Sequence, residues 1–229
     1  MSMKGINLGA GKGWMSKTER GNNWIGLDKL EGKYLDEKTI LPAGNEEIDI
    51  VYSSHFFEHI DNATGINLIN ESYRVLKKGG VIRILVPDFF KIYESIKQTL
   101  LTSKGDKIEL LEELRGWMGN FDIINGKSVK INQQRTIKID ENFWMKELKS
   151  STMPEFFKFI QSQIPKELDY QIPSRQHINW WDKNKLNKIN PNLKFKYSKH
   201  GEGKIKLPLN KFDGYVDRRD ITLYMEAIK

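Results

Sequence analysis

Two short segments of this 229-residue chain hold side chains whose types and spacing suit chemistry. One is a glycine loop, Gly9-Ala10-Gly11-Lys12-Gly13, which follows the apolar residue Leu8. Glycines allow the backbone to approach a ligand closely, and the amides of the loop and of a following helix are available for polar contact. The other is His55-Phe56-Phe57-Glu58-His59, which holds two imidazoles and a carboxylate. Such groups transfer protons or bind metal ions.

Asp28 connects the glycine loop with a type of ligand. It ends the strand-like segment that begins at Trp24, 15 residues after Gly13. A carboxylate at this place in a nucleotide-binding sheet accepts the hydroxyl hydrogens of a ribose. The loop reads Gly-x-Gly-x-Gly rather than the Gly-x-Gly-x-x-Gly of dinucleotide binders, which hold a pyrophosphate. The two features together predict a nucleoside-containing ligand that lacks phosphates.

The histidine segment also reads His-x-x-Glu-His, the signature of one class of zinc peptidase. It follows the strand-like residues Ile48 to Tyr52 through a Ser53-Ser54 turn, so a zinc peptidase is disfavoured and no metal site is predicted. Without a metal, His55 is a candidate general base for an acceptor hydroxyl, because imidazole titrates near neutral pH. A role in orienting the loop is the alternative, and His59 is expected to make a structural hydrogen bond.

The elements that must position these groups alternate between strands and helices over the first ninety residues, as in a parallel α/β sheet. Apolar and β-branched runs predict four strands, at Lys4 to Leu8, Trp24 to Asp28, Ile48 to Tyr52 and Val81 to Val86.

An amphipathic helix is predicted from Ala63 to Lys78, with Asp61 as its N-cap and the paired glycines after Lys78 as its end. Four apolar residues are expected on its buried face: Ile66, Ile69, Tyr73 and Leu76.

The remainder of the chain divides into two parts, and together with residues 1–88 they predict a single domain over 1–229. Residues 89–175 are rich in aromatic side chains at helical spacing and predict a helical insert. Residues 176–229 resume the alternation, with a helix near Asp182 to Ile189 and strands at Leu193 to Tyr197 and Ile221 to Ile228.

Composition excludes several classes of protein. The chain has no cysteine, so it forms no disulfide, no thiolate metal site and no cysteine nucleophile. No apolar run approaches the roughly 18 to 20 residues of a membrane helix, and a cytoplasmic location is expected. The formal charge is +7, from 37 basic and 30 acidic residues, and all of it falls in residues 101–229. A basic second half suits an anionic substrate, while solvated surface lysines are the alternative.

Four blocks of the sequence resemble the class I S-adenosylmethionine-dependent methyltransferases, specifically the small type 11 group often found among cell-surface polysaccharide enzymes. Together the blocks span most of residues 4–88: Ile6 to Gly13, Trp24 to Asp28, Asp49 to His59, and Glu71 to Pro87. The resemblance implies a Rossmann-like α/β fold with a seven-stranded, mostly parallel sheet whose last strand is antiparallel. Residues 1–88 would then form the cofactor-binding half, and residues 89–175 an insert on the acceptor side.

The resemblance also implies a set of cofactor-binding residues. Gly9, Gly11 and Gly13 would face the methionine part of S-adenosylmethionine, with Leu8 and Ala10 in the same loop. Asp28 would bind the ribose, Asp36 the adenine, and Ser53 would lie beside the methionine moiety. The reaction would leave S-adenosylhomocysteine as product. For Asp36 a solvated loop acid is the alternative interpretation.

Two further assignments follow from the same resemblance. Relatives often carry a histidine facing the acceptor at the place of His177, which makes it an equal candidate to His55 for catalysis. Packing of His177 beside Trp180 and Trp181 is the alternative. Some methyltransferases hold a divalent ion with a Glu-x-x-Glu-His cluster, but here the first glutamate is His55, so a metal at this cluster is left open.

The predicted function is O-methylation of a sugar, a nucleotide-linked sugar or another small anionic metabolite. The absence of cysteine excludes C5 methylation of pyrimidines through a cysteine adduct, and no Asn/Asp-Pro-Pro-aromatic block indicates amino-group methylation of bases. A nucleic-acid methyltransferase that uses the basic half is the second interpretation. The third is a cofactor-binding domain that acts by protein interaction. The sequence does not determine the oligomeric state.

Overall fold

The computed structural model describes residues 3–11, 23–28, 35–103, 107–118, 123–124, 127–128, 140–163, 177–199, 202–205 and 220–229. The chain forms two compact units. One combines Met1–Pro87 with Asn179–Lys229, and the other is Asp88–Ile178. The expected insert, 89–175, falls within the second unit.

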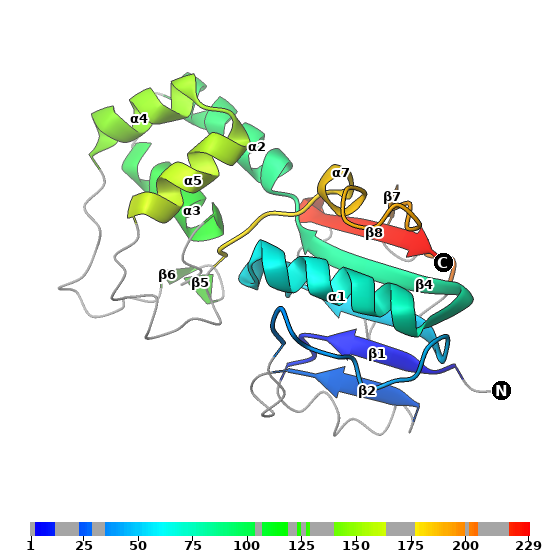
Figure 1. Ribbon diagram of the computed structural model, residues 1–229. Helices are drawn as coiled ribbons and strands as arrows, with labels where there is room; N and C mark the ends of the chain where they lie inside the picture. The colour runs from blue at the N-terminus through cyan, green and yellow to red at the C-terminus, as the bar shows by residue number, and fades with distance from the viewer. Residues whose placement is uncertain are drawn as a thin grey trace. The chain divides into compact units, whose positions relative to one another are not determined.

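A six-stranded sheet organises the first unit (Figure 1). Its order is β2-β1-β3-β4-β8-β7, with β2, β1, β3 and β4 parallel, and with β8 antiparallel to both β4 and β7. The mostly parallel α/β fold with antiparallel C-terminal strands is confirmed. The strands are β1 (Gly5–Leu8), β2 (Trp24–Leu27), β3 (Ile48–Ser54), β4 (Leu76–Pro87), β7 (Lys196–Ser198) and β8 (Thr222–Ile228).

The described residues form six strands of this sheet, where seven were expected. The sequence did not assign the seventh strand to particular residues. Residues 35–47, the described part of the connection between β2 and β3, contain turns and bends but no strand. Asp36 accepts hydrogen bonds from Lys38 N and Thr39 Oγ1, which closes a local turn. The side chain of Arg74 donates to the carbonyls of Leu41 and Ala43. Part of the backbone of this loop is thus paired with side chains, while Glu46 N and Glu47 N donate to the carbonyls of Arg74 and Val75.

Helix α1 (Asn62–Val75) is confirmed at its start but not at its end. The Asp61 carboxylate accepts from Thr64 N at 2.7 Å, as expected of an N-cap. Leu76 already belongs to β4, where it pairs with Ile48. Lys77 to Gly80 were predicted to end the helix, but they form an irregularity within the strand, held where Gly79 N donates to Lys229 O. The backbone pairing of Gly79 with Lys229 places the two glycines within β4, so they do not mark the end of the helix.

The buried face of α1 also differs from the predicted one. Ile66 is 45% exposed, although it was expected in the core. The face is instead set by Gly65, where a Cβ would overlap the ring of Trp181. The pattern of apolar residues missed this because half of the buried stripe is small or polar: Thr64, Gly65, Leu68, Ile69, Ser72 and Val75.

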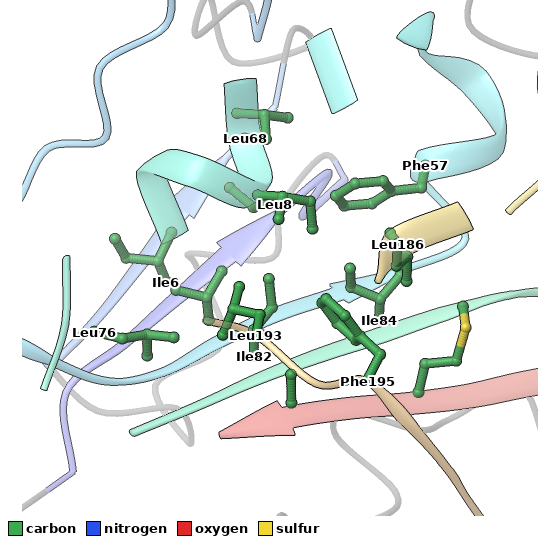
Figure 2. Close-up of a cluster of buried hydrophobic side chains, with 14 of the residues drawn as sticks. Ile6, Leu8, Phe57, Leu68, Leu76, Ile82, Ile84, Leu186, Leu193 and Phe195 are labelled. Carbon is green, nitrogen blue, oxygen red and sulfur yellow. The ribbon is translucent and has the colours of Figure 1, made fainter. Parts of the chain in front are cut away.

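The core of this unit lies between the sheet and the segments that cover one of its faces (Figure 2). From Val81 to Pro87, strand β4 is buried throughout, as expected of a strand buried on both sides, and its residues are apolar except Arg83, which pairs with Glu226. Helix α7 (Lys183–Leu186) is shorter than predicted, with Asp182 as its N-cap. Leu193 and Phe195 were expected in a strand but pack into the core just before β7. The labelled core side chains include Ile6, Leu8, Phe57, Leu68, Ile82, Ile84, Leu186, Leu193 and Phe195.

The second unit is helical, with α2 (Phe89–Thr102), α3 (Lys107–Met118), α4 (Glu141–Ser150) and α5 (Met153–Gln163). It also contains the hairpin β5 (Ile123–Ile124) and β6 (Lys127–Ser128). Its described aromatic rings pack on one another: Trp144 lies 5.1 Å from Phe159 and 6.3 Å from Phe156, centroid to centroid. Most of these rings are therefore core residues of the insert.

None of the helices in the described part of the chain is long and apolar enough to cross a membrane.

The corrected helix face makes a direct prediction. Leu68→Ala should lower the free energy of unfolding by about 2 to 5 kcal/mol, because Leu68 is fully buried and the change leaves a cavity. Ile66→Ala, the matched aliphatic control, should change it by less than about 0.5 kcal/mol. Urea denaturation of both variants measures the difference. Equal losses would contradict the observed face.

Candidate active site

The candidate site lies at the edge of the sheet where β1, β2 and β3 end. Strand β1 lies between β2 and β3, and all three are parallel, so the chain direction brings their carboxyl ends to one edge. The strand order reverses at β1, because β2 follows on one side of it and β3 on the other. In open α/β sheets, ligands bind outside the carboxyl ends of the strands at such a switch point.

The glycine loop turns sharply as it leaves β1. Gly9 N and Ala10 N both donate to Leu27 O, at 2.8 and 3.1 Å, so the loop folds back over the end of β2. Gly9 has φ +70° and Gly11 φ +74°, which L side chains rarely adopt. A Cβ on Gly9 would overlap Phe56, whereas a Cβ on Gly11 would have none of the atoms of the described residues within 4 Å. Gly9 therefore allows close packing with Phe56, whereas Gly11 is required by its left-handed conformation.

Asp28 and the glycine loop meet, as their spacing predicted. Gly11 N donates to Asp28 Oδ2 at 3.0 Å. This hydrogen bond joins the end of β1 to the end of β2 and places a carboxylate beside Gly11. Gly13, the third glycine of the predicted set, lies outside the described residues.

Ser53 and Asp36 lie in different surroundings. Ser53 is buried at the end of β3, and its hydroxyl donates to Leu8 O at 3.1 Å, so it ties β3 to β1 directly below the loop. Asp36 is on the turn between β2 and β3. The Thr39 hydroxyl and then the Lys38 amide hold the pKa of Asp36 below its ordinary value. Their roles toward a cofactor remain predictions.

His55 follows β3 in a strained conformation. Its φ is +50°, and its N–H donates to Leu85 O at 2.9 Å. Its ring lies between two polar groups: Nδ1 is 3.2 Å from Glu58 Oε1, and Nε2 is 3.3 Å from Thr222 Oγ1. A left-handed conformation at a non-glycine residue persists only where the surroundings enforce it. It is one of the features that mark functional sites.

Glu58 lies in a short 3-10 helix, η3 (Phe57–His59), and its side chain is almost completely buried. Residues that follow the insert in sequence hold this turn. Trp181 Nε1 donates to Phe57 O at 2.7 Å, and Asn179 N donates to Glu58 O at 3.2 Å. His59 Nε2 lies 4.0 Å from Glu58 Oε1. The turn that carries Glu58 is thus held by residues more than a hundred positions later.

Lys185 contacts the residues that hold this turn. Its Nζ donates to Asn179 Oδ1 at 2.6 Å and to Trp180 O at 2.8 Å. It also lies over the ring of Trp181, 4.1 Å from the centroid. Burial lowers the pKa of Lys185 to about 8, and Asp182 partly opposes that shift. The sequence contained no motif for this cluster.

His177 belongs to the helical unit. It is buried, its ring centroid lies 5.4 Å from that of Phe89, and its carbonyl accepts from Gln161 Nε2 at 2.6 Å. These contacts are those of a packed residue, which was the alternative to a catalytic role. The catalytic assignment remains a prediction.

Sequence reasoning singled out His55 but missed Thr222, and it treated Glu58 only as a candidate metal ligand. Glu58 could have been paired with His55 from their spacing of three residues, which brings side chains together in a helical turn. Nothing in the sequence pointed to Thr222, because its contact with His55 spans 167 positions.

Residues 6–84 match the family model described as a methyltransferase domain, Methyltransf_11. This segment is a class I S-adenosylmethionine-dependent methyltransferase domain. The predicted resemblance is thereby confirmed, and S-adenosylmethionine is the cofactor of such a domain. The described residues fit it, because the left-handed turn at Gly11 brings the glycine loop against the Asp28 carboxylate at the end of β2.

Solved structures show distant likeness to the methyltransferase. A Mesorhizobium loti S-adenosylmethionine-dependent methyltransferase is 14% identical, with a TM-score of 0.45 over 100% of this chain and 91% of that one. An Archaeoglobus fulgidus methyltransferase is 16% identical, with a TM-score of 0.37 over 99% and 86%. These likenesses assign no substrate or partner to this chain. A comparison with curated proteins found no match.

The two glycines of the loop should differ in their tolerance of alanine. Gly11→Ala should cost about 1 to 2 kcal/mol, which is the strain of a left-handed L residue. Gly9→Ala should cost more, because the same strain is added to overlap with Phe56. Urea denaturation with an unchanged m-value measures both. Equal costs would contradict the described packing at Gly9.

Lys185 should give this protein a pH-dependent stability. Its pKa of about 8 in the folded state lies below the ordinary 10.5, so the unfolded chain binds more protons between these values. The free energy of unfolding should therefore rise between about pH 8 and 10.5, by roughly 1 to 2 kcal/mol after allowance for partial exposure.

Lys185→Met and Lys185→Arg are the controls for this slope. Neither side chain titrates in that range, so both variants should lack the rise in stability seen for the wild-type protein. Urea denaturation at several pH values measures it. A slope that persists in both variants would assign it to another group.

Proposed function

We propose that this protein is an O-methyltransferase that transfers the methyl group of S-adenosylmethionine to a sugar, a nucleotide-linked sugar or another small anionic metabolite. The observation that carries the proposal is the His55 imidazole. It stands at the end of β3, paired with the buried Glu58, next to Phe56, which packs on the glycine loop. A hydroxyl acceptor must lose a proton as it is methylated, and a paired imidazole is suited to take it.

The cofactor-binding residues are proposed from the geometry of the sheet edge. Leu8, Gly9, Ala10 and Gly11 line the turn after β1, and Gly13 continues the same loop in sequence. Asp28 would accept from the ribose hydroxyls, since its carboxylate already lies at the loop. The remaining assignments are Ser53 beneath the methionine part and Asp36 toward the adenine.

Methyl transfer requires the protein to align the methyl donor with the acceptor and to take one proton from the acceptor. S-adenosylmethionine supplies an electrophilic methyl carbon and leaves as S-adenosylhomocysteine. The backbone of the glycine loop and Asp28 orient the donor, and the acceptor lies in line with it. His55 is the proposed base, and His177 is the second candidate because the insert is expected on the acceptor side.

The proposed class of methyl acceptor is inferred from the distribution of charged residues along the chain. The excess of basic residues lies wholly in positions 101–229, which hold the insert and the closing strands. This supports an anionic acceptor, such as a nucleotide-linked sugar of polysaccharide biosynthesis in the cytoplasm. The same charge supports a nucleic acid as the second candidate acceptor, whose binding would weaken steeply with salt. A domain that binds the cofactor without catalysis is the third.

Cofactor binding is tested first. The full chain should bind S-adenosylmethionine and S-adenosylhomocysteine in calorimetric titration, and Asp28→Ala should weaken this binding at least tenfold, because it removes charge-assisted hydrogen bonds to the ribose. Glu37→Ala, an exposed acid on the neighbouring turn, is the control and should change nothing. Binding that disappears after chelation would point to a metal at the histidine cluster, and no binding would reject the proposal.

The acceptor class is tested by S-adenosylhomocysteine formation with a panel of sugars, nucleotide-linked sugars and hydroxy acids, alongside RNA and DNA. Turnover should appear with a small hydroxyl compound and depend weakly on salt. Turnover only with nucleic acid, and a steep loss with added salt, would favour the second candidate. Cofactor binding without any turnover would favour the third.

A further inference from the structure

Thr222 lies at the same edge of the sheet as the cofactor loop. It is the first residue of β8 and pairs with Pro87, the last residue of β4. Because β8 runs antiparallel to β4, it begins where the parallel strands end. Its hydroxyl lies 3.3 Å from His55 Nε2, and its side chain is only partly buried. A partly exposed hydroxyl thus contacts the imidazole at the edge of the sheet where the parallel strands end.

The surroundings of His55 determine which ring nitrogen carries the proton. Glu58 Oε1 lies 3.2 Å from Nδ1, and a carboxylate in its ionised form can only accept a hydrogen bond. With Glu58 in that form, Nδ1 carries the hydrogen and Nε2 is left as an acceptor. The Thr222 hydroxyl, 3.3 Å from Nε2, must in turn donate. The three groups therefore form a directed chain, with each hydrogen bond pointing toward Glu58.

Backbone hydrogen bonds hold the residues of this hydrogen-bonded chain in place. The backbone of His55 is held at φ +50° with its N–H on Leu85 O, and its ring is held by the contacts of Nδ1 with Glu58 and of Nε2 with Thr222. Glu58 is held from the other side, since its own carbonyl accepts from Asn179 N and the preceding one from Trp181 Nε1. Strain and buried partners at one residue indicate that its orientation matters.

We propose that Glu58, His55 and Thr222 form a proton relay, in which Thr222 rather than His55 touches the acceptor hydroxyl. This inference rests on the proposed function and deepens it. The acceptor O–H proton passes to Thr222 Oγ1 while the Thr222 proton passes to His55 Nε2. The electron pair released on the acceptor oxygen would form the new bond to the methyl carbon as the bond from that carbon to sulfur breaks, and the electron pair of the broken bond would stay on the sulfur of S-adenosylhomocysteine. The imidazolium that results is balanced by the Glu58 carboxylate, which orients it and is not itself protonated.

The first test requires no acceptor. In a ¹⁵N–¹H correlation spectrum of the full-length ¹⁵N-labelled protein, His55 should be the Nδ1–H tautomer when neutral, and His55→Asn assigns its signals among the four histidines. Thr222→Val should keep this tautomer and shift the Nε2 resonance toward the value of a nitrogen without a hydrogen bond. Thr222→Ser should keep the wild-type value. An Nε2–H tautomer, or no shift in Thr222→Val, would overturn the relay.

The second test uses the acceptor identified by the panel. Thr222→Val should lower kcat by about 10- to 100-fold, because it removes the group that relays the proton. Thr222→Ser should retain most of it, and Thr99→Val, on the surface of α2, is the matched control. Affinity for S-adenosylmethionine should be unchanged in all three. A normal kcat in Thr222→Val would overturn the relay and leave the methyltransferase proposal standing, whereas failure of the wild-type protein to bind the cofactor would reject that proposal itself.

Discussion

The parallel pairing of β1 with both β2 and β3 is the constraint on which the site depends. It makes β1 the point where the order of strands reverses, and it brings three carboxyl ends to one edge. The hydrogen bonds from the loop to Leu27 O and from Ser53 to Leu8 O join these ends to one another. Gly11 and Asp28 can meet only because this pairing exists. The cofactor edge is thus a consequence of strand order.

A second requirement is that the segment from His55 to His59 be held in place, since His55 has a strained backbone conformation. Glu58 is buried close to the end of β3, where an unsupported carboxylate would be costly. The printed partner of the carboxylate is His55 Nδ1, at 3.2 Å, while the Trp181 indole, packed edge to face on Phe57 at 5.6 Å, and Asn179 hold the backbone of the turn through its carbonyls. Lys185 secures these two residues in turn. Residues that close the fold therefore determine the geometry at His55, which explains why the C-terminal segment belongs to the same compact unit as the first 87 residues.

The two units differ in whether their sequences contain recognisable functional motifs. The chemistry of methyl transfer needs a donor site that many enzymes share, so the first unit carries readable blocks over residues 6–84. Acceptor recognition varies from enzyme to enzyme and lies in segments with no common pattern. In the helical unit the aromatic residues at helical spacing pack mainly on one another. Their arrangement provides stability, and it does not by itself identify a substrate.

The sequence by itself determined the fold class, the strands β1, β2, β3 and β8, the N-cap of α1 and the meeting of Asp28 with the glycine loop. These follow from local periodicity and from spacing between consecutive elements, which nearby residues control. The face and end of α1 and the partners of His55 were decided only in the tertiary structure. Each depends on a residue far along the chain: Trp181 against Gly65, Lys229 beside Gly79, and Thr222 beside His55. No local pattern encodes such contacts, because they exist only once the sheet has brought distant segments together.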